Sequence, residues 1–178
     1  MSETAISGNS RKTRALVEGA LCVALSVVFS YLKLFSMPQG GSITLEMAPL
    51  LYFSYKYRYK WGITAGFVSG LLQAVFGGYV AHPVQGILDY PAAFACMGLA
   101  GCFGENAKGV IAGTAFAVVS RLVCHVLSGA VFFASYAPEG QNPWIYSIVY
   151  NASFMVPSAI ITAATAWTLW RKFLKNQS

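Results

Sequence analysis

One acidic residue opens an apolar stretch in a chain that contains very few charges. Asp89 follows the segment HPVQGIL and begins a stretch that stays apolar to Phe103, and only six of the 178 residues are Asp or Glu. An ionisable side chain within such a stretch is costly to bury, so it marks a place where a partner or a ligand is expected. Asp89 could accept hydrogen bonds from a ligand or balance its positive charge. The structural alternative is an ion pair with Arg121, which would also keep Asp89 ionised and oriented.

A second group of residues shares one face of a predicted helix. Arg121, His125 and Gly129 are spaced four residues apart, so an α-helix places them in one row. At 1.5 Å per residue, Arg121 lies roughly 12 Å deeper along the helix axis than Gly129. The missing side chain at Gly129 would leave room for a ring. His125 is either a hydrogen-bonded core histidine or part of a binding site.

The composition is that of an integral membrane protein. Hydrophobic residues make up 56% of the chain and charged residues only 10%, whereas soluble domains carry about a quarter charged residues. The net charge is +6, but the basic residues lie in short clusters between apolar runs. We interpret these clusters as topology signals and not as a nucleic-acid-binding patch.

Six apolar segments account for nearly the whole chain. About 20 apolar residues span a bilayer as a helix, and no Pro-rich or Ser-rich linker and no internal repeat divides the sequence. We therefore predict one domain, residues 1–178, that is an all-α integral membrane protein with six transmembrane helices in a compact bundle. The predicted spans are residues 14–35, 43–56, 61–80, 86–104, 109–133 and 146–170.

The basic residues predict the orientation of this bundle. Ten of the 12 Lys and Arg residues fall on one side of the predicted spans. This side is the cytoplasm, because cytoplasmic loops are enriched in Lys and Arg. Both termini are then cytoplasmic, and the outer loops are residues 36–42, 81–85 and 134–145. The ten residues are Arg11, Lys12, Arg14, Lys56, Arg58, Lys60, Lys108, Arg171, Lys172 and Lys175.

With this orientation, polar side chains within the spans gather in the outer half of the bundle. Asp89 begins the fourth span from outside, and Tyr79 ends the third span there. The sixth span begins with Tyr146, Ser147 and Asn151. This asymmetry predicts a pocket that is open to the exterior and not a channel through the bundle. The aromatic residues near the same end form either an interfacial belt or walls for a flat or cationic ligand.

Two further polar residues near this end have open roles. Glu46 either pairs with Lys33 or lies in the pocket. His82 precedes Pro83 in an outer loop, where a role in loop geometry is favoured.

Several enzyme motifs are missing from the sequence. It contains no GxxxxGK[ST] phosphate loop, and therefore no ATPase site of its own, and no HExxH or GxSxG motif. The cysteines do not form a CxxC motif, so we expect packing residues and neither a metal site nor a disulfide. They are Cys22, Cys96, Cys102 and Cys124.

Small residues recur every four positions on three of the predicted spans. Such rows let helix backbones approach closely in a membrane. We expect packing within the bundle for most of them, whereas a row that faces lipid could dock a partner subunit. The rows are Gly62, Gly66 and Gly70; Ala20 and Ala24; and Ser158, Thr162 and Ala166.

Longer stretches of the sequence resemble one known family. The strings are SMPQGGSITLEMAP, HPVQGILDYPAAFACMGLAG and HVLSGAVFFASYAPEGQNPWIYSIVYNASFMVPS. They resemble the thiamine-specific substrate-binding (S) component of energy-coupling factor (ECF) transporters. The resemblance covers about residues 14–170 and includes the small-residue row of the first span.

The resemblance implies a function and a set of partners. An S component is a six-helix protein of the bacterial plasma membrane that binds thiamine near its extracellular face. It needs no cofactor and is not an enzyme. It docks with a membrane coupling subunit and two cytoplasmic ATPases, which drive transport of the bound vitamin. The docking face corresponds to Ala20 and Ala24 here.

The resemblance also implies which residues bind the ligand. An acidic residue followed by tyrosine matches Asp89 and Tyr90, where the acid would accept hydrogen bonds from the aminopyrimidine or balance the thiazolium charge. The other implied positions are Tyr79, Arg121, His125, Gly129, Phe133, Tyr146, Ser147 and Asn151.

The chain departs from the family pattern at a few of these positions. Some relatives have Glu at the position of Asp89, Lys at that of Arg121 and Trp at that of Phe133, and a Trp of the first outer loop has no counterpart. These differences affect the ring contacts and the affinity but not the ligand class.

Two other functions remain as alternatives. One is a stand-alone secondary transporter for a small organic cation, and the other is a small membrane enzyme. Uptake by the isolated chain or a chemically modified ligand would distinguish them.

Overall fold

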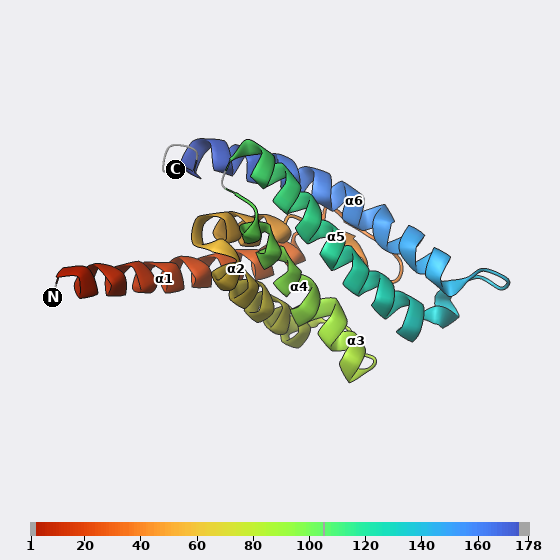
Figure 1. The fold of residues 1–178 in the computed structure, drawn as a ribbon. Coiled ribbons are helices and arrows are strands. Elements are labelled where there is room, and N and C mark those ends of the chain that lie inside the picture. The colour runs from red at the N-terminus through yellow and green to blue at the C-terminus, as the bar shows by residue number, and fades with distance from the viewer. Residues whose placement is uncertain (1–2, 105, 175–178) are drawn as a thin grey trace.

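The protein is a bundle of helices with one short β-hairpin (Figure 1). The computed structural model describes residues 3–104 and 106–174. Lys175, one of the predicted cytoplasmic residues, lies outside them. The helices are α1 (Glu3–Tyr31), α2 (Met47–Gly77), α3 (Pro83–Ile87), α4 (Ala93–Ala95), α5 (Ala107–Phe132) and α6 (Pro143–Leu169), with four shorter helical turns at Leu88–Ala92, Cys96–Cys102, Ala134–Tyr136 and Trp170–Leu174.

The helix α2 reverses its direction in the middle. Arg58 has the dihedral angles φ 69° and ψ 174°, which no helical residue adopts. A Cβ atom added to Gly62 would overlap the Ser54 hydroxyl, although eight residues of a straight helix rise about 12 Å. The chain therefore folds back at Arg58, between the second and third predicted spans.

Glycines on the second half of α2 let it pack tightly against residues 83–102. A Cβ atom on Gly66 would overlap the Phe94 carbonyl oxygen, and one on Gly70 would overlap the Tyr90 carbonyl oxygen. Gly62 approaches the Cα atom of Gly98 in the same way. The prediction that this row packs within the bundle is confirmed. It is also confirmed for the row on α6, where Ser158, Thr162 and Ala166 are buried.

The first loop differs from the prediction. The first predicted span ended at residue 35, but α1 ends at Tyr31, and Phe35–Ser36 (β1) pairs antiparallel with Ser42–Ile43 (β2). Gly40 allows the tight turn because it adopts φ 98°, a conformation that L side chains rarely take. Backbone pairing across this turn replaces the last helical turn that the apolar pattern had predicted.

The core lies where the first half of α2 meets residues 83–102 and α5. Its largest fully buried side chains include Phe53, Tyr55 and Phe94. The Tyr55 hydroxyl donates to the Val110 carbonyl oxygen at 2.7 Å and lies 2.8 Å from the hydroxyl of Thr114. This buried polar group is therefore satisfied by α5, as a low-dielectric core requires.

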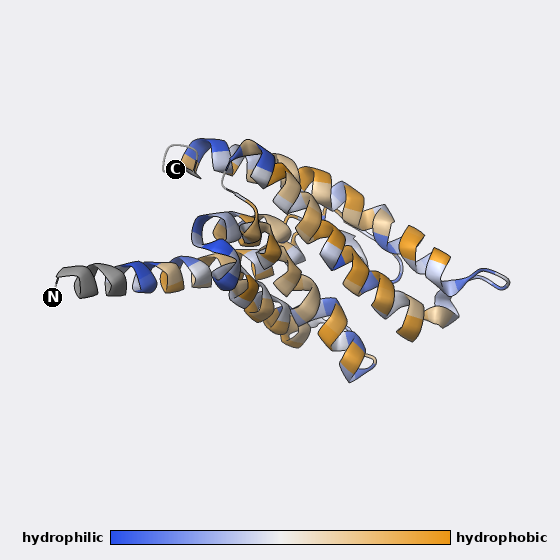
Figure 2. Ribbon diagram, in the orientation of Figure 1, coloured by the Kyte–Doolittle hydropathy of each residue, from blue (hydrophilic) through white to orange (hydrophobic). Residues whose placement is uncertain are grey.

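The outer surface is strongly apolar. Figure 2 shows hydrophobic residues along α5 and α6, and hydrophilic residues at the N-terminal part of α1, the bend of α2 and the end of α6. Within the described part of the chain, three helices are long and apolar enough to cross a membrane, namely Ser10–Tyr31, Ala107–Phe132 and Pro143–Phe173. The all-helical fold class is confirmed, with the addition of the hairpin.

The glycine packing leads to a test of stability. We expect Gly66→Ala to lower the free energy of unfolding by about 1–3 kcal/mol, because a rigid backbone cannot move aside as a side chain can. The matched control is Gly77→Ala, whose Cβ would lie 3.4 Å from the Tyr31 hydroxyl, an ordinary contact. Thermal unfolding in detergent measures both. A similar melting temperature for the two variants would contradict the packing argument.

Candidate functional site

A cavity of about 410 Å³ lies among the hairpin, the end of α2 and the facing parts of α5 and α6. Small-molecule sites in proteins usually have volumes of about 300–1,000 Å³. All ten residues predicted to bind ligand line this cavity; they are Tyr79, Asp89, Tyr90, Arg121, His125, Gly129, Phe133, Tyr146, Ser147 and Asn151. The structure therefore brings the whole predicted set together, and their role in binding stays a prediction.

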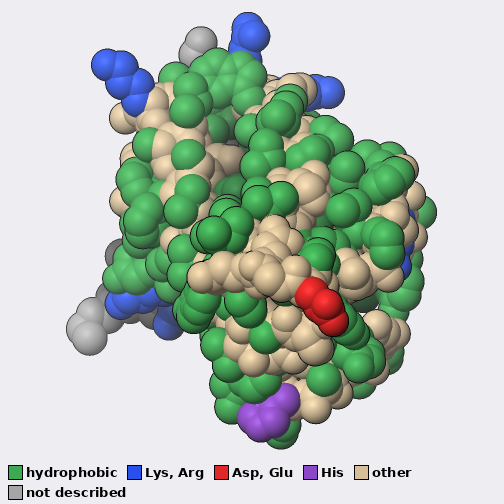
Figure 3. All heavy atoms as spheres, turned by 90° about the vertical axis from the view of Figure 1, so that its right-hand side faces the viewer, with side chains coloured by type: hydrophobic (Ala, Val, Ile, Leu, Met, Phe, Trp, Pro, Cys, Tyr) green, Lys and Arg blue, Asp and Glu red, His purple; other side chains and the backbone are tan. Residues whose placement is uncertain are grey.

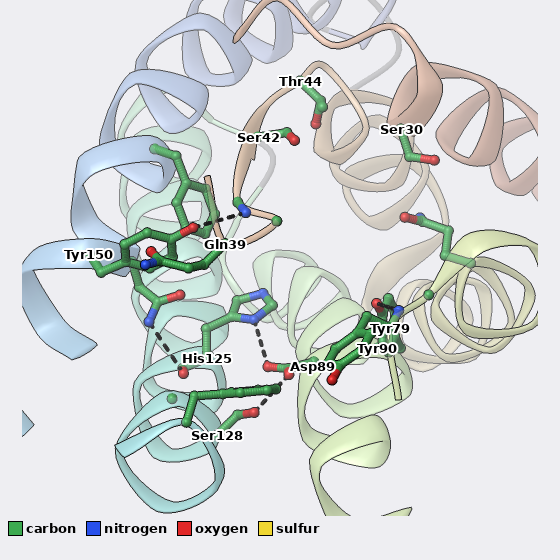
Figure 4. A pocket seen from close by; sticks show the side chains of 18 of the residues that line it. Ser30, Gln39, Ser42, Thr44, Tyr79, Asp89, Tyr90, His125, Ser128 and Tyr150 are labelled. Carbon is green, nitrogen blue, oxygen red and sulfur yellow. Dashed lines mark hydrogen bonds and ion pairs between the residues drawn. The ribbon is translucent and has the colours of Figure 1, made fainter. Parts of the chain in front are cut away.

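Asp89 is the centre of the polar network in the cavity (Figure 4). Its Oδ2 accepts hydrogen bonds from Gln85 Nε2 at 2.6 Å and from Ser128 Oγ at 2.7 Å. Its Oδ1 lies 3.0 Å from His125 Nδ1. Donors from α3, which directly precedes the turn of Asp89, and from α5 thus hold the carboxylate.

A helical irregularity positions this carboxylate. Residues Leu88–Ala92 form a π-helical turn that contains Pro91. Proline has no N–H to donate to the preceding turn, and one-turn π-helices often occur at functional sites. The extra residue in this turn changes the direction in which Asp89 leaves the helix.

Arg121 does not pair with Asp89, so the structural alternative for Asp89 is wrong. Arg121 Nη2 instead lies 2.6 Å from Glu46 Oε1, and Arg121 Nε donates to His125 Nε2 at 3.3 Å. The reason is depth, because His125 lies one helical turn closer to Asp89 and separates the two charges. The open question about Glu46 is also answered: of the two alternatives, it lies in the pocket, where it pairs with Arg121.

These contacts define the tautomer of His125. The guanidinium of Arg121 can only donate hydrogen bonds, so Nε2 of His125 must accept. The proton then lies on Nδ1, which donates to Asp89. Glu46, Arg121, His125 and Asp89 form one hydrogen-bonded chain in which the histidine is uncharged.

The guanidinium of Arg121 is otherwise enclosed by protein. Its central carbon lies 4.1 Å from the centre of the Phe94 ring, a distance typical of a cation–π contact. Its Nη1 is buried and has no hydrogen-bond partner among the described residues. One strong donor at this depth is therefore left for another group.

Aromatic rings form two walls of the cavity. Phe133 stacks on Tyr136 with ring centres 5.6 Å apart, and its ring centre lies 6.2 Å from that of Tyr79. On α6, the rings of Tyr146 and Tyr150 stack at 6.0 Å. Both walls offer flat faces to the space between them.

Polar contacts on α6 hold the second wall against α5. Ser147 Oγ donates to the Val126 carbonyl oxygen at 2.9 Å, and Asn151 Nδ2 donates to the Ser147 carbonyl oxygen at 2.9 Å and to the His125 carbonyl oxygen at 3.4 Å. A Cβ atom on Gly129 would overlap Ser147 Oγ. Gly129 therefore permits the close approach of α6, in addition to lining the cavity.

The β-hairpin closes one side of the cavity. The Tyr146 hydroxyl donates to Gln39 Oε1 at 3.1 Å, and the Gly41 N–H donates to the Tyr150 hydroxyl at 3.3 Å. Figure 4 shows Gln39, Ser42 and Thr44 across the cavity from Asp89. The hairpin thus belongs to the site as well as to the fold.

Tyr90 and His82 have structural contacts. The Tyr90 hydroxyl accepts a hydrogen bond from the Tyr79 N–H at 2.8 Å and so fixes the chain after α2. His82 Nδ1 accepts from the Val84 N–H at 3.2 Å at the start of α3, and its ring stacks on Phe132 with centres 4.9 Å apart. The predicted role of His82 in loop geometry is confirmed.

The sequence analysis missed several residues of the site. Gln85 lies one helical turn before Asp89, and Ser128 lies three residues after His125, so helical spacing could have identified both. Gln39 could not be found in this way, because the hairpin that brings it to α6 was not predicted. The described residues contain no cluster of three or more His, Cys, Asp or Glu side chains that could hold a metal ion.

The molecular surface at this end of the bundle is largely apolar. Figure 3 views the end of the molecule where α5 and α6 are joined, and hydrophobic side chains cover much of it, while Lys and Arg side chains lie toward its outline. Electrostatic forces between a ligand and the carboxylate of Asp89 are weakly screened in such surroundings.

Known proteins resemble this chain over most of its length. The family "Thiamine transporter protein (Thia_YuaJ)" matches residues 16–177. The thiamine transporter ThiT of Bacillus subtilis is 39% identical over 170 residues, which cover 86% of this chain and 88% of that protein. The thiamine transporter ThiT of Lacticaseibacillus paracasei is 29% identical over 171 residues, which cover 86% and 85% of the two chains.

Two solved structures share the fold. One, described as ThiT from Listeria monocytogenes, has a TM-score of 0.81 at 23% identity and covers 93% of this chain and 97% of its own. The other, described as the S component of a bacterial ECF transporter, has a TM-score of 0.67 at 19% identity and covers 94% and 99% of the two chains. The family match and the 39% identical relative confirm the resemblance found in the sequence, and the chain belongs to the thiamine transporter protein family.

Proposed function

We propose that this protein is the thiamine-binding S component of an ECF-type importer and that the cavity around Asp89 holds the vitamin. The observation that carries the proposal is the carboxylate of Asp89, which lines the same cavity as the two aromatic walls and is held by the uncharged side chains of Gln85, Ser128 and His125. Membership of a family of thiamine transporters supports the same ligand.

The charges around the cavity favour a cationic ligand. The charge of Arg121 is balanced by Glu46 at 2.6 Å, and the three partners of Asp89 bring no positive charge. Lys33 also lines the cavity, on the connection between α1 and the hairpin, where it is exposed. The thiazolium ring of thiamine carries one positive charge, which would balance the remaining carboxylate of Asp89.

The aromatic walls favour a flat ligand. Phe133 and Tyr79 on one side and Tyr146 on the other could contact the two rings of thiamine, through stacking and through cation–π attraction to the thiazolium. The aminopyrimidine carries an amino group that can donate to Asp89, and Asn151 would fix its polar edge. The hairpin would then cover the bound ligand.

We further propose six membrane crossings with both termini in the cytoplasm. In Figure 1 the start of α1, the end of α6, the bend of α2 and the start of α5 lie at one end of the molecule. The basic clusters of the sequence lie in these parts, and Figure 2 shows hydrophilic residues at three of them. Cytoplasmic segments of membrane proteins are enriched in Lys and Arg, so the cavity at the other end would open to the exterior of a bacterial plasma membrane.

Transport itself would depend on partner subunits. The sequence has no phosphate-binding loop for ATP, so we assign ATP hydrolysis to two cytoplasmic ATPases that act through a membrane coupling subunit. Ala20 and Ala24 are exposed on α1, beside the exposed side chains of Leu16 and Leu21. Small residues on an apolar helix face suit close contact with another membrane helix.

The first prediction concerns the carboxylate. We expect Asp89→Asn to weaken thiamine binding by about 100-fold or more, because it removes the carboxylate that balances the positive charge of the ligand. Isothermal titration calorimetry on purified protein in detergent measures the dissociation constant. The control is Glu139→Gln, an exposed loop charge, which should not change it. Equal affinity of Asp89→Asn and the unmodified protein would remove Asp89 from the site.

The second prediction concerns the ion pair beneath the site. We expect Glu46→Gln to weaken thiamine binding by about tenfold, because Arg121 would then add an unbalanced positive charge near the ligand cation. A double variant, Glu46→Gln with Arg121→Gln, should recover most of the lost affinity. If the double variant binds no better than Glu46→Gln alone, charge balance is not the reason for the effect.

The third prediction separates binding from transport. Replacing both Ala20 and Ala24 with Trp should abolish thiamine uptake by cells and leave the dissociation constant of the isolated protein unchanged. Radiolabelled thiamine uptake and calorimetry measure the two properties. Uptake into liposomes that contain this chain alone would instead favour a stand-alone transporter.

A further inference from the structure

Two cysteine side chains lie next to each other near the site but outside the ligand cavity. The sulfur atoms of Cys96 and Cys124 are 4.0 Å apart. Both cysteines are free, and both side chains are partly exposed. Of the other two cysteines, Cys102 is exposed and Cys22 is buried. The sequence analysis expected all four to be buried packing residues, and this was wrong for three of them, because an apolar run in a membrane helix includes positions on the outer surface.

The cysteine pair joins the same two elements that hold the polar network. Cys96 follows the turn that carries Asp89, and Cys124 directly precedes His125 on α5. The Arg121 guanidinium lies 4.1 Å from the centre of the Phe94 ring and so adds a contact between the same two elements. Together with the hydrogen bonds of Asp89 to His125 and Ser128, it holds the two elements that carry the thiols against each other.

We propose that Cys96 and Cys124 are a modification site, a dithiol that peroxide oxidises to a disulfide between residues 83–102 and α5. A disulfide bond is about 2.05 Å long, so the sulfurs must approach each other by about 2 Å. A change of cysteine rotamer moves its sulfur by about 3 Å. The required approach is therefore within the range of a side-chain rotation.

The oxidation is balanced with one peroxide molecule. Hydrogen peroxide converts one thiol into a sulfenic acid and releases one water. The second thiol attacks this sulfur, the S–S bond forms, and a second water leaves. The two thiols lose two electrons and the peroxide gains them. Hydrogen peroxide is small and uncharged, so it can reach partly exposed thiols at an apolar surface.

The test uses the intact protein in detergent and hydrogen peroxide. We expect a mass loss of about 2 Da that dithiothreitol reverses, since disulfide formation removes two hydrogen atoms. A variant with Cys22→Ala and Cys102→Ala keeps only the pair and should show the same loss, with one peptide that joins Cys96 to Cys124. In Cys96→Ser, oxidation should stop at a sulfenic acid that dimedone traps. Sulfinic acid without a disulfide in the pair-only variant, or a disulfide between two copies of the chain, would overturn the proposal.

A second measurement tests whether the disulfide changes ligand binding in the cavity, and this part rests on the proposed function. Formation of the disulfide moves the side chain of Cys124, the residue directly before His125. We therefore expect oxidation to weaken thiamine binding by about tenfold, the effect of losing one good hydrogen bond. Cys96→Ser should bind thiamine equally well before and after peroxide. Unchanged affinity of the bridged protein would overturn this coupling. If the reduced protein does not bind thiamine, the proposed function fails, and the mass measurement still decides whether the disulfide forms.

Discussion

The buried carboxylate of Asp89 is the constraint on which the rest of the site depends. A carboxylate in apolar surroundings is stable only when donors surround it, and Gln85, Ser128 and His125 provide them. His125 can donate from Nδ1 because its Nε2 accepts a hydrogen bond from Arg121. Glu46 balances the positive charge of Arg121. One chain of contacts thus ties the start of α2 and the middle of α5 to the turn that carries Asp89. None of these three donors carries a positive charge, so the negative charge of Asp89 is available to a cationic ligand.

The backbone places these groups by close packing. Glycines on α2 bring residues 83–102 against it, and Gly129 lets α6 approach α5 through Ser147. The π-helical turn at Leu88–Ala92 then presents Asp89 to α5. Aromatic side chains that follow α2 and α5 form one wall, those of α6 form the other, and the hairpin covers the space between them. A cavity with one charge and flat walls follows from this arrangement, which suits a planar organic cation.

Much of this site could be predicted from the sequence. The row of Arg121, His125 and Gly129 follows from the period of a helix, and the resemblance to a known family placed the other residues at the same cavity. Pairings between distant residues could not be predicted. The sequence offers both Asp89 and Glu46 as partners for Arg121, and the depths of these residues in the bundle select Glu46. The hairpin was missed because an apolar run does not show where backbone pairing replaces a helix. The exposure of the cysteines was missed because lipid-facing and core positions have the same hydrophobicity.

The central claim is that Asp89 binds the ligand as a counter-charge, and one comparison of ligands tests it most directly. Calorimetry can compare thiamine with an analogue of the same shape in which an uncharged ring replaces the thiazolium. We expect the neutral analogue to bind at least about tenfold more weakly, and we expect this difference to disappear when Asn replaces the aspartate. Equal affinity of the unmodified protein for both ligands would contradict the account, because the cavity would then recognise the shape of the vitamin and not its charge.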